Sequence, residues 1–167
     1  FYERHHQGMI NALLAMRMMK GRFYLDDEVQ YDGKSAIKPD EAYYRGDSQG
    51  GIAGTTYMAL STDVTRGLVG EPGSPYNLLL NRSIDFDPFF IVLKISVPDA
   101  VSVQIFLSLV EMWWDRAEPM GYLPYINKDM FPGTPKHEIM MHVAIGDYQV
   151  TPLGAHLMAR AVGAKIP

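Results

Sequence analysis

The sequence predicts an α/β protein with a mostly parallel sheet flanked by helices. Segments of strand character alternate along the chain with segments of helical periodicity, and this order is typical of parallel sheets. The chain has 167 residues, of which 47% are hydrophobic and 20% charged, so about one domain with a sizeable core is expected. No internal repeat and no linker rich in serine and glycine divides the sequence.

The helices are predicted from the spacing of apolar residues. In Glu3–Lys20 such residues recur at intervals of three and four, and Gly21 follows where a C-terminal cap belongs. The face of this helix that we expect to be buried carries Ile10, Leu13, Leu14 and Met18. Further helices are expected at Ile52–Leu60, Asn77–Asn81, Asp99–Trp114 and Pro152–Ala164. On the helix at 99–114 the expected buried face carries Val103, Phe106, Leu107 and Val110.

The strands are predicted between these helices, at Ala42–Arg45, Thr65–Gly70 and Glu138–Ile145. The polar segment Phe23–Pro39 contains Asp-Gly and Lys-Pro pairs and is expected to be a loop with turns. Residues 76–135 are helical with irregular interruptions, which indicates a helical insertion before the last strand. We expect its apolar cluster to pack inside the insertion, with the lining of an acyl pocket as the alternative. That cluster consists of Met112, Trp113, Trp114 and Met120.

The composition argues against several classes of function. The net charge is −4 and no basic stripe is present, so a nucleic acid is not an expected partner. Without cysteine, the chain has no disulfide scaffold, no cysteine-ligated zinc and no thiol nucleophile. The longest apolar run, Ile139–Ile145, is interrupted by His142 and is far too short to cross a membrane. A membrane span is therefore not expected.

The motif Gly46-x-Ser48-x-Gly50 lies between a predicted strand and a predicted helix. This is the pattern of a nucleophile elbow, in which a serine on a tight turn has a strained backbone and its small neighbours leave the hydroxyl accessible. The helix that follows offers N–H groups and a positive dipole end to a developing oxyanion. By composition the motif arises by chance about 0.06 times per chain. The alternative is a glycine-rich helix start without chemistry.

Asp147 is the candidate acid. It follows the strand predicted at Glu138–Ile145 and precedes the last helix, and α/β proteins build their sites at the carboxyl ends of strands. Its place after Ser48 also matches the order of nucleophile and acid in hydrolases with this elbow. One alternative is an aspartate that only caps the turn into the helix. Glu71, directly after the second strand, is a weaker candidate for the same role.

Two stretches resemble the α/β-hydrolase fold: Tyr-Arg-Gly-Asp-Ser-Gln-Gly-Gly at 44–51 and Ala-Ile-Gly-Asp-x-x-Val at 144–150. The resemblance is nearest to bacterial esterases, lipases and peptidase-like members. It implies a nucleophile at Ser48, a triad carboxylate at Asp147 and an oxyanion donor in the backbone N–H of Gln49. It also implies three segments: 1–75 with the nucleophile, 76–135 as a helical cap or lid, and 136–167 with the acid strand and the final helix.

The chain departs from the family where the triad should be completed. The family's histidine lies on a loop after one more strand, and the sequence stops at the position where that strand would begin. The opening strands and the loop with the second oxyanion donor have no counterpart either. We therefore expect a partial hydrolase fold, a fragment of a larger hydrolase whose catalytic histidine lies outside this chain. A shortened homologue that has lost catalysis is the alternative.

None of the five histidines is a strong candidate for the missing base. His156 lies inside the predicted last helix, where the family has no catalytic loop. His5 and His6 begin the first helix and are expected at a solvated or interface position. His142, within the last strand, is expected to be a satisfied core histidine.

The function expected from the resemblance is that of a serine hydrolase acting on a small-molecule carboxylic ester or amide through an acyl-enzyme at Ser48. Such chemistry requires no organic cofactor and no metal. A metal site of His137, Glu138 and His142 is set aside because 137 does not share a strand face with the other two. The expected partners are missing segments of the same protein or a companion chain. The alternative function is an inactive, hydrolase-like binding or interaction module.

Overall fold

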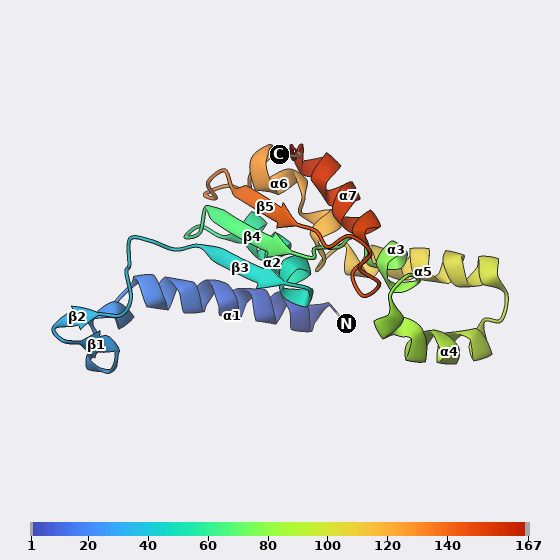
Figure 1. The fold of residues 1–167 in the computed structure, drawn as a ribbon, viewed down its shortest axis with the longest axis horizontal. Coiled ribbons are helices and arrows are strands. Elements are labelled where there is room, and N and C mark those ends of the chain that lie inside the picture. The colour runs from blue at the N-terminus through green and yellow to red at the C-terminus, as the bar shows by residue number, and fades with distance from the viewer. Residues whose placement is uncertain (1, 166–167) are drawn as a thin grey trace.

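A three-stranded parallel sheet lies at the centre of the molecule (Figure 1). The computed structural model describes residues 2–165. The sheet has the order β3 (Tyr44–Asp47), β4 (Arg66–Gly70) and β5 (Glu138–His142), and each neighbouring pair is parallel. The α/β class predicted from the alternation of elements is therefore confirmed. The sheet is small, and β5 ends at His142 rather than at Ile145 as predicted.

The carboxyl ends of the three strands are aligned at one edge of the sheet. Asp47 pairs with Gly70, and Gly70 pairs with His142. Just beyond these pairs, the N–H of Ser48 donates to the carbonyl of Gly70 at 2.9 Å, and the N–H of Glu71 donates to the carbonyl of His142 at 2.7 Å. The loops that follow all three strands therefore leave the sheet from the same edge.

One face of the sheet is covered by helices. Helix α2 (Gln49–Leu60) packs against β3 and β4, and α6 (Pro124–Asn127) and α7 (Pro152–Val162) complete this layer. Eight of the twelve residues of α2 are buried, because the helix lies between the sheet and the segments around it. The main cluster of buried apolar side chains consists of Ala59, Leu123, Ile126, Met158 and Val162.

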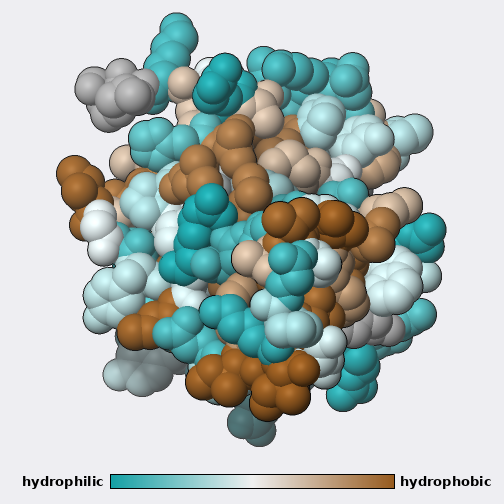
Figure 2. All heavy atoms as spheres, turned by 90° about the vertical axis from the view of Figure 1, so that its right-hand side faces the viewer, coloured by the Kyte–Doolittle hydropathy of each residue, from teal (hydrophilic) through white to brown (hydrophobic). Residues whose placement is uncertain are grey.

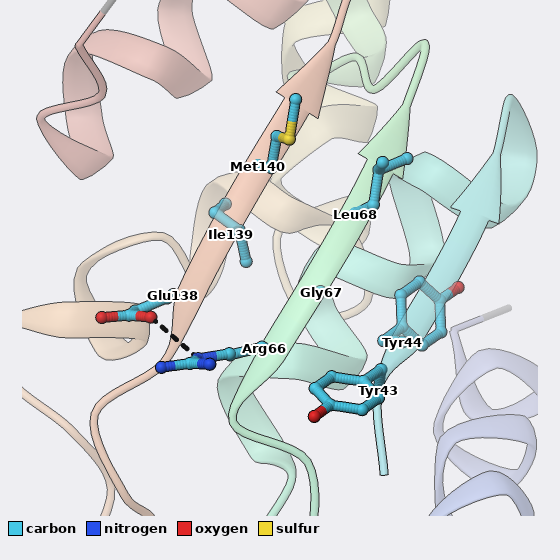
Figure 3. A pocket seen from close by; sticks show the side chains of 8 residues that line it. All are labelled: Tyr43, Tyr44, Arg66, Gly67, Leu68, Glu138, Ile139 and Met140. Atoms are coloured by element: carbon cyan, nitrogen blue, oxygen red, sulfur yellow. Dashed lines mark hydrogen bonds and ion pairs between the residues drawn. The ribbon is translucent and has the colours of Figure 1, made fainter.

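The opposite face of the sheet has no helical cover among the described residues. Figure 3 shows Tyr43, Leu68 and Met140 on this face, together with the ion pair of Arg66 with Glu138 at 3.2 Å. Met140 is 65% exposed although it lies in the middle of a strand. Parallel sheets are normally buried on both faces, so this face is unusually open for its class.

Helix α1 (Glu3–Lys20) has the predicted bounds but not the predicted buried face. Leu14 is 62% exposed, and Ile10 and Met18 are also exposed. Of the four predicted positions, only Leu13 packs against the core. The other side chains through which the helix contacts the core are Met9 and Met16. The prediction was wrong because so many positions of this helix are apolar that spacing alone did not single out the packed face.

The segment predicted as a loop contains short regular elements. The 3-10 turns η1 (Phe23–Leu25) and η2 (Asp27–Val29) precede a small antiparallel hairpin of β1 (Gln30–Tyr31) and β2 (Lys34–Ser35). Its turn is Asp32-Gly33, and both residues have positive φ, at 49° and 72°. The Asp-Gly pair supplies the turn that a two-residue hairpin loop requires.

Most of the insertion between β4 and β5 extends away from the sheet as an arm, on the right of Figure 1, while α6 near its end packs against α2 and α7. The helices of the arm are α3 (Tyr76–Leu80), η3 (Ile84–Phe86), α4 (Asp87–Ser96), α5 (Ala100–Trp114) and η4 (Pro119–Gly121). On α5 the predicted face is partly right, since Val103 and Leu107 are buried while Phe106 is 44% exposed. Met112 and Trp113 are also exposed, so the expected packing of that apolar cluster is wrong for these two. Trp114 and Met120 are partly buried, and Met120 packs against the main core cluster.

In the described part of the chain, no single helix is long and apolar enough to span a membrane. The stretch Ile84–Ser96 and helix α5 pass the length and composition test only when taken together, and they are bent by 115° at the break between them.

Candidate active site

Ser48 stands at the turn from β3 into α2 with a strained backbone. Its φ of 58° and ψ of −121° lie in a region that residues with a side chain rarely adopt. Ser48 is exposed to solvent and lies at the edge of the sheet where the carboxyl ends of the strands are aligned. The strand, the sharp turn and the helix that the Gly-x-Ser-x-Gly motif requires are therefore all present.

The two glycines of the motif differ in their steric roles. A Cβ on Gly46 would lie 2.5 Å from the carbonyl oxygen of Gly50 and would also collide with the hydroxyl of Tyr44. A Cβ on Gly50 would meet only that hydroxyl, at 3.9 Å. The Tyr44 hydroxyl donates to the Gly50 carbonyl at 2.7 Å and holds the start of α2 against β3. The steric requirement for glycine that the motif predicts therefore holds at Gly46 and not at Gly50.

Gln49 is the first residue of α2, so its backbone N–H belongs to the group that has no partner inside the helix. Its side chain leads away from the turn, and Nε2 donates to the Tyr76 hydroxyl at 3.2 Å. Tyr76 opens α3, and its ring meets that of Trp114 edge-on at 5.7 Å between centroids. Burial raises the pKa of Tyr76. Gln49 thus joins the candidate nucleophile turn to the base of the arm.

Asp147 lies in the loop between β5 and α7 and is half-buried. Its Oδ1 accepts hydrogen bonds from the N–H groups of Gln149 at 2.8 Å and Val150 at 3.0 Å. Asp147 therefore stabilises its own turn, and Oδ2 has no hydrogen bond within residues 2–165. Within the same range, no hydrogen bond connects the side chain of Ser48 or Asp147 to a histidine.

The histidines are arranged differently from the prediction. The buried one is His137, whose Nε2 is 2.8 Å from the carbonyl oxygen of Ser61. His142, expected in the core, has a side chain that is 69% exposed, because β5 points it to the uncovered face of the sheet. Its Nδ1 lies 3.6 Å from Glu71 Oε1. His6, expected at a solvated or interface position, contacts the carbonyl of Arg116 in the same chain.

The pair of Glu71 and His142 was missed by sequence analysis. Each residue lies at the carboxyl end of a strand, and the two strands are neighbours in the sheet. Glu71 also has a positive φ of 44°, as Ser48 does. The adjacency of the strands was the missing information, since each residue alone is an ordinary polar residue after a strand.

A group of carboxylates links the arm to the loop after β4. Carboxylate oxygens of Glu111, Asp115 and Glu118 lie within 4.8 Å of one another. Within residues 2–165, these three acids form a group that is close enough together to hold a metal ion. Glu111 and Glu118 are buried, whereas Asp115 is exposed. Glu118 accepts from the hydroxyl of Ser74 and from the N–H of Met120, and Glu111 Oε2 accepts from the N–H of Asn77 at 2.7 Å.

Both buried acids have raised pKa values. Burial away from water raises the pKa of Glu118 to about 8, and the nearby Glu111 adds to this because two negative charges repel. Burial also raises the pKa of Glu111. Glu111 Oε1 is buried without a hydrogen-bond partner among the described residues. A proton on Glu118 can supply the missing donor, and Glu118 is expected to be protonated at neutral pH.

Two of the grooves on the molecule lie away from Ser48. One, of about 370 Å³, lies on the uncovered face of the sheet among the residues of Figure 3. Another, of about 450 Å³, runs between α1 and α2 and is lined by methionines, small residues and Tyr44 and Tyr57. Neither includes Ser48 or Asp147. Sequence analysis did not anticipate either groove.

No protein-family model matches this chain, and neither a curated protein nor a solved structure matches it. The features of the chain that bear on its function are therefore the residues and geometry of the turn at Ser48, the position of Asp147 and the layout of the sheet edge.

Proposed function

We propose that this chain is the nucleophile-bearing and acid-bearing part of a serine hydrolase of the α/β-hydrolase type. The observation that carries the proposal is the backbone of Ser48, strained at a strand-to-helix turn with its side chain open to solvent. Strain of this kind costs of order 1–3 kcal/mol and is found mostly where function requires it. A serine that merely begins a helix has an ordinary extended backbone and no such cost.

The proposed reaction is acyl transfer from a carboxylic ester, or an amide, to water. Ser48 Oγ attacks the carbonyl carbon while a histidine base takes its proton, and the N–H of Gln49 donates to the oxyanion. Collapse of the tetrahedral intermediate breaks the bond to the alcohol or amine, which leaves with the proton from the histidine. Water then attacks the acyl-enzyme by the same steps. Asp147 Oδ2, which is free of other described hydrogen bonds, would orient the histidine and stabilise its charge.

In this proposal the histidine comes from polypeptide outside the described residues. Both outer strands of the sheet, β3 and β5, have one edge without a strand partner among residues 2–165, and one face of the sheet is uncovered. Unpaired edges and an open parallel face are positions where further strands and helices pack. Residues 76–135 would then form the cap of the enzyme, inserted between β4 and β5.

A non-catalytic binding module is the second candidate. It is favoured by one observation, the lack of a histidine hydrogen-bonded to Ser48 or Asp147 in the described chain. In that case Ser48 is a turn residue and the exposed surfaces are for binding.

Fluorophosphonate labelling distinguishes the two candidates. The protein is purified from its source with any companion polypeptide, treated with the probe, and measured by intact mass and peptide mapping. We expect one adduct on Ser48, loss of the adduct in Ser48→Ala, and an unchanged adduct in Ser108→Ala, which removes another exposed serine. A folded preparation without an adduct on Ser48 would contradict the hydrolase and support the binding module.

A further inference from the structure

Helix α4 is apolar around its whole circumference and yet has no buried residue. Its sequence is Asp-Pro-Phe-Phe-Ile-Val-Leu-Lys-Ile-Ser, and its main contacts are with the 3-10 turn that precedes it. Ile95 is 78% exposed, and Phe89, Ile91 and Val92 are exposed to a similar degree. A ten-residue helix is marginal by itself in water, and apolar helices of this kind are normally buried. Among residues 2–165, the helix therefore has no packing partner beyond this turn that would bury it.

The exposed apolar surface continues along α5. Figure 2 looks toward this end of the molecule and shows several apolar patches open to the viewer between polar side chains. Ten large apolar side chains of the two helices are between 44% and 78% exposed: Phe89, Ile91, Val92, Ile95, Val101, Ile105, Phe106, Leu109, Met112 and Trp113. Together they expose on the order of 1,000 Å². The largest apolar patch on a typical monomer is only about 300–600 Å², whereas a stable dimer buries about 800 Å² on each partner.

The charges on the arm favour a second copy of the chain over a lipid surface. Attraction to anionic lipid requires clustered lysine or arginine, and between Ile84 and Trp114 the sole basic residue is Lys94. Within residues 2–165 neither Asp87 nor Lys94 belongs to an ion pair; the Lys94 ammonium lies 4.7 Å from the centre of the Phe90 ring. Asp87 is in the first turn of α4 and Lys94 in the last.

We propose that two copies of this chain associate through the α4–α5 arm, with α4 of one copy antiparallel to α4 of the other. A twofold axis beside Ile91 lies midway between positions 87 and 94. It therefore brings Asp87 of each copy to the level of Lys94 of the other, and both ion pairs form at once. The apolar side chains between them are removed from water in the same contact. The interface is independent of any chemistry at Ser48.

The first test measures the mass of the protein by sedimentation velocity and light scattering from about 1 to 100 μM. We expect a dimer that dissociates on dilution. Ile95→Glu should weaken association at least tenfold. The matched control is Leu14→Glu, which places the same charge at an exposed apolar site on α1 and should leave the dimer unchanged. Because both sites are exposed, circular dichroism should show unaltered folding in both variants.

A second variant tests the geometry itself. The chain has no cysteine, so Ile91→Cys introduces a single thiol beside the proposed axis. Under mild oxidation it should form a disulfide-linked dimer quickly, whereas Leu14→Cys should not. A monomer at all concentrations, equal loss of the dimer in Ile95→Glu and Leu14→Glu, or equal cross-linking of the two cysteine variants would overturn the proposal. Arm-dependent binding of a monomer to phosphatidylcholine vesicles would also overturn it and would identify lipid as the partner.

Discussion

The buried carboxyl pair of Glu111 and Glu118 leads to a specific prediction about stability and pH. Glu118 contributes to the contact between the arm and the loop after β4, through Ser74. Burial raises its pKa from 4.5 to about 8 in the folded protein, so between these values the folded state holds a proton that the unfolded state has released. Stability then falls as the pH rises, from its full value below about pH 4.5 to its lowest value above about pH 8.

The magnitude follows from the pKa. Each pH unit between the two pKa values changes the free energy of unfolding by about 1.4 kcal/mol for one such group. Between pH 5 and pH 8 the native protein should therefore lose a few kcal/mol through Glu118. In Glu118→Gln the amide has nearly the shape of the protonated acid: its oxygen can accept from the N–H of Met120 and its nitrogen can donate to Ser74. We expect this variant to be within about 1 kcal/mol of the native protein at pH 5 and clearly more stable at pH 9.

The assay is urea unfolding at 25 °C, followed by tryptophan fluorescence and circular dichroism, at steps from pH 5 to pH 9. The quantity of interest is the difference in unfolding free energy between the native chain and Glu118→Gln, because groups common to both cancel. Glu28→Gln, which removes an exposed carboxylate, serves as the control and should follow the native profile. The reasoning is refuted if Glu118→Gln and the native protein have parallel profiles, or if the native protein gains stability over this range.

Other predictions concern the nucleophile turn and the core, and each is measured by urea unfolding. Gly51→Ala should lower the free energy of unfolding by at least about 1–3 kcal/mol, since the new Cβ would collide with the carbonyl of Gly70. Gly8→Ala has open space around the new Cβ in α1 and should raise the free energy of unfolding by about 1 kcal/mol. Met58→Ala should cost about 2–5 kcal/mol, because Met58 is fully buried; a smaller loss would mean that the core around it collapses on the cavity. Ser48→Gly should stabilise the fold by about 1–3 kcal/mol through relief of the positive φ, and an unchanged stability would show that the turn is not strained.

The central elements could be predicted because local patterns determine them. Helices α2, α5 and α7 and strand β5 have apolar runs or periodicity, whereas β3 and β4 have weaker signals. The bounds of all of these elements differ from the predicted ones by a few residues. The turn at Ser48 was also predictable, since the glycine spacing and the flanking strand and helix are a local signal. The position of Asp147 in a loop after the last strand was predicted on the same grounds.

What could not be predicted depends on contacts between distant segments. The packed face of α1 is decided by Tyr57 and Met58 on α2, and the sequence of α1 is apolar on more than one side. The pairing of Glu71 with His142 follows from the adjacency of β4 and β5, which no local pattern specifies. Likewise, Glu118 resembles a surface residue beside Arg116 and a proline until the fold places it against Ser74.

The ring of Tyr44 also affects how the turn can vary in evolution. A Cβ at Gly54 would run into this one side chain, whether or not Ser48 carries out any chemistry, whereas a Cβ at Gly46 would also collide with the backbone of Gly50. The glycine at 54 is thus coupled to the tyrosine and not to the nucleophile, while the glycine at 46 is required by the turn as well. In a related sequence with a small residue at position 44, this ring no longer prevents alanine at position 54. A related sequence that keeps the tyrosine ring must keep glycine at position 54. Covariation between positions 44 and 54 would record packing, and only the residue at position 48 would record whether the chemistry has been retained.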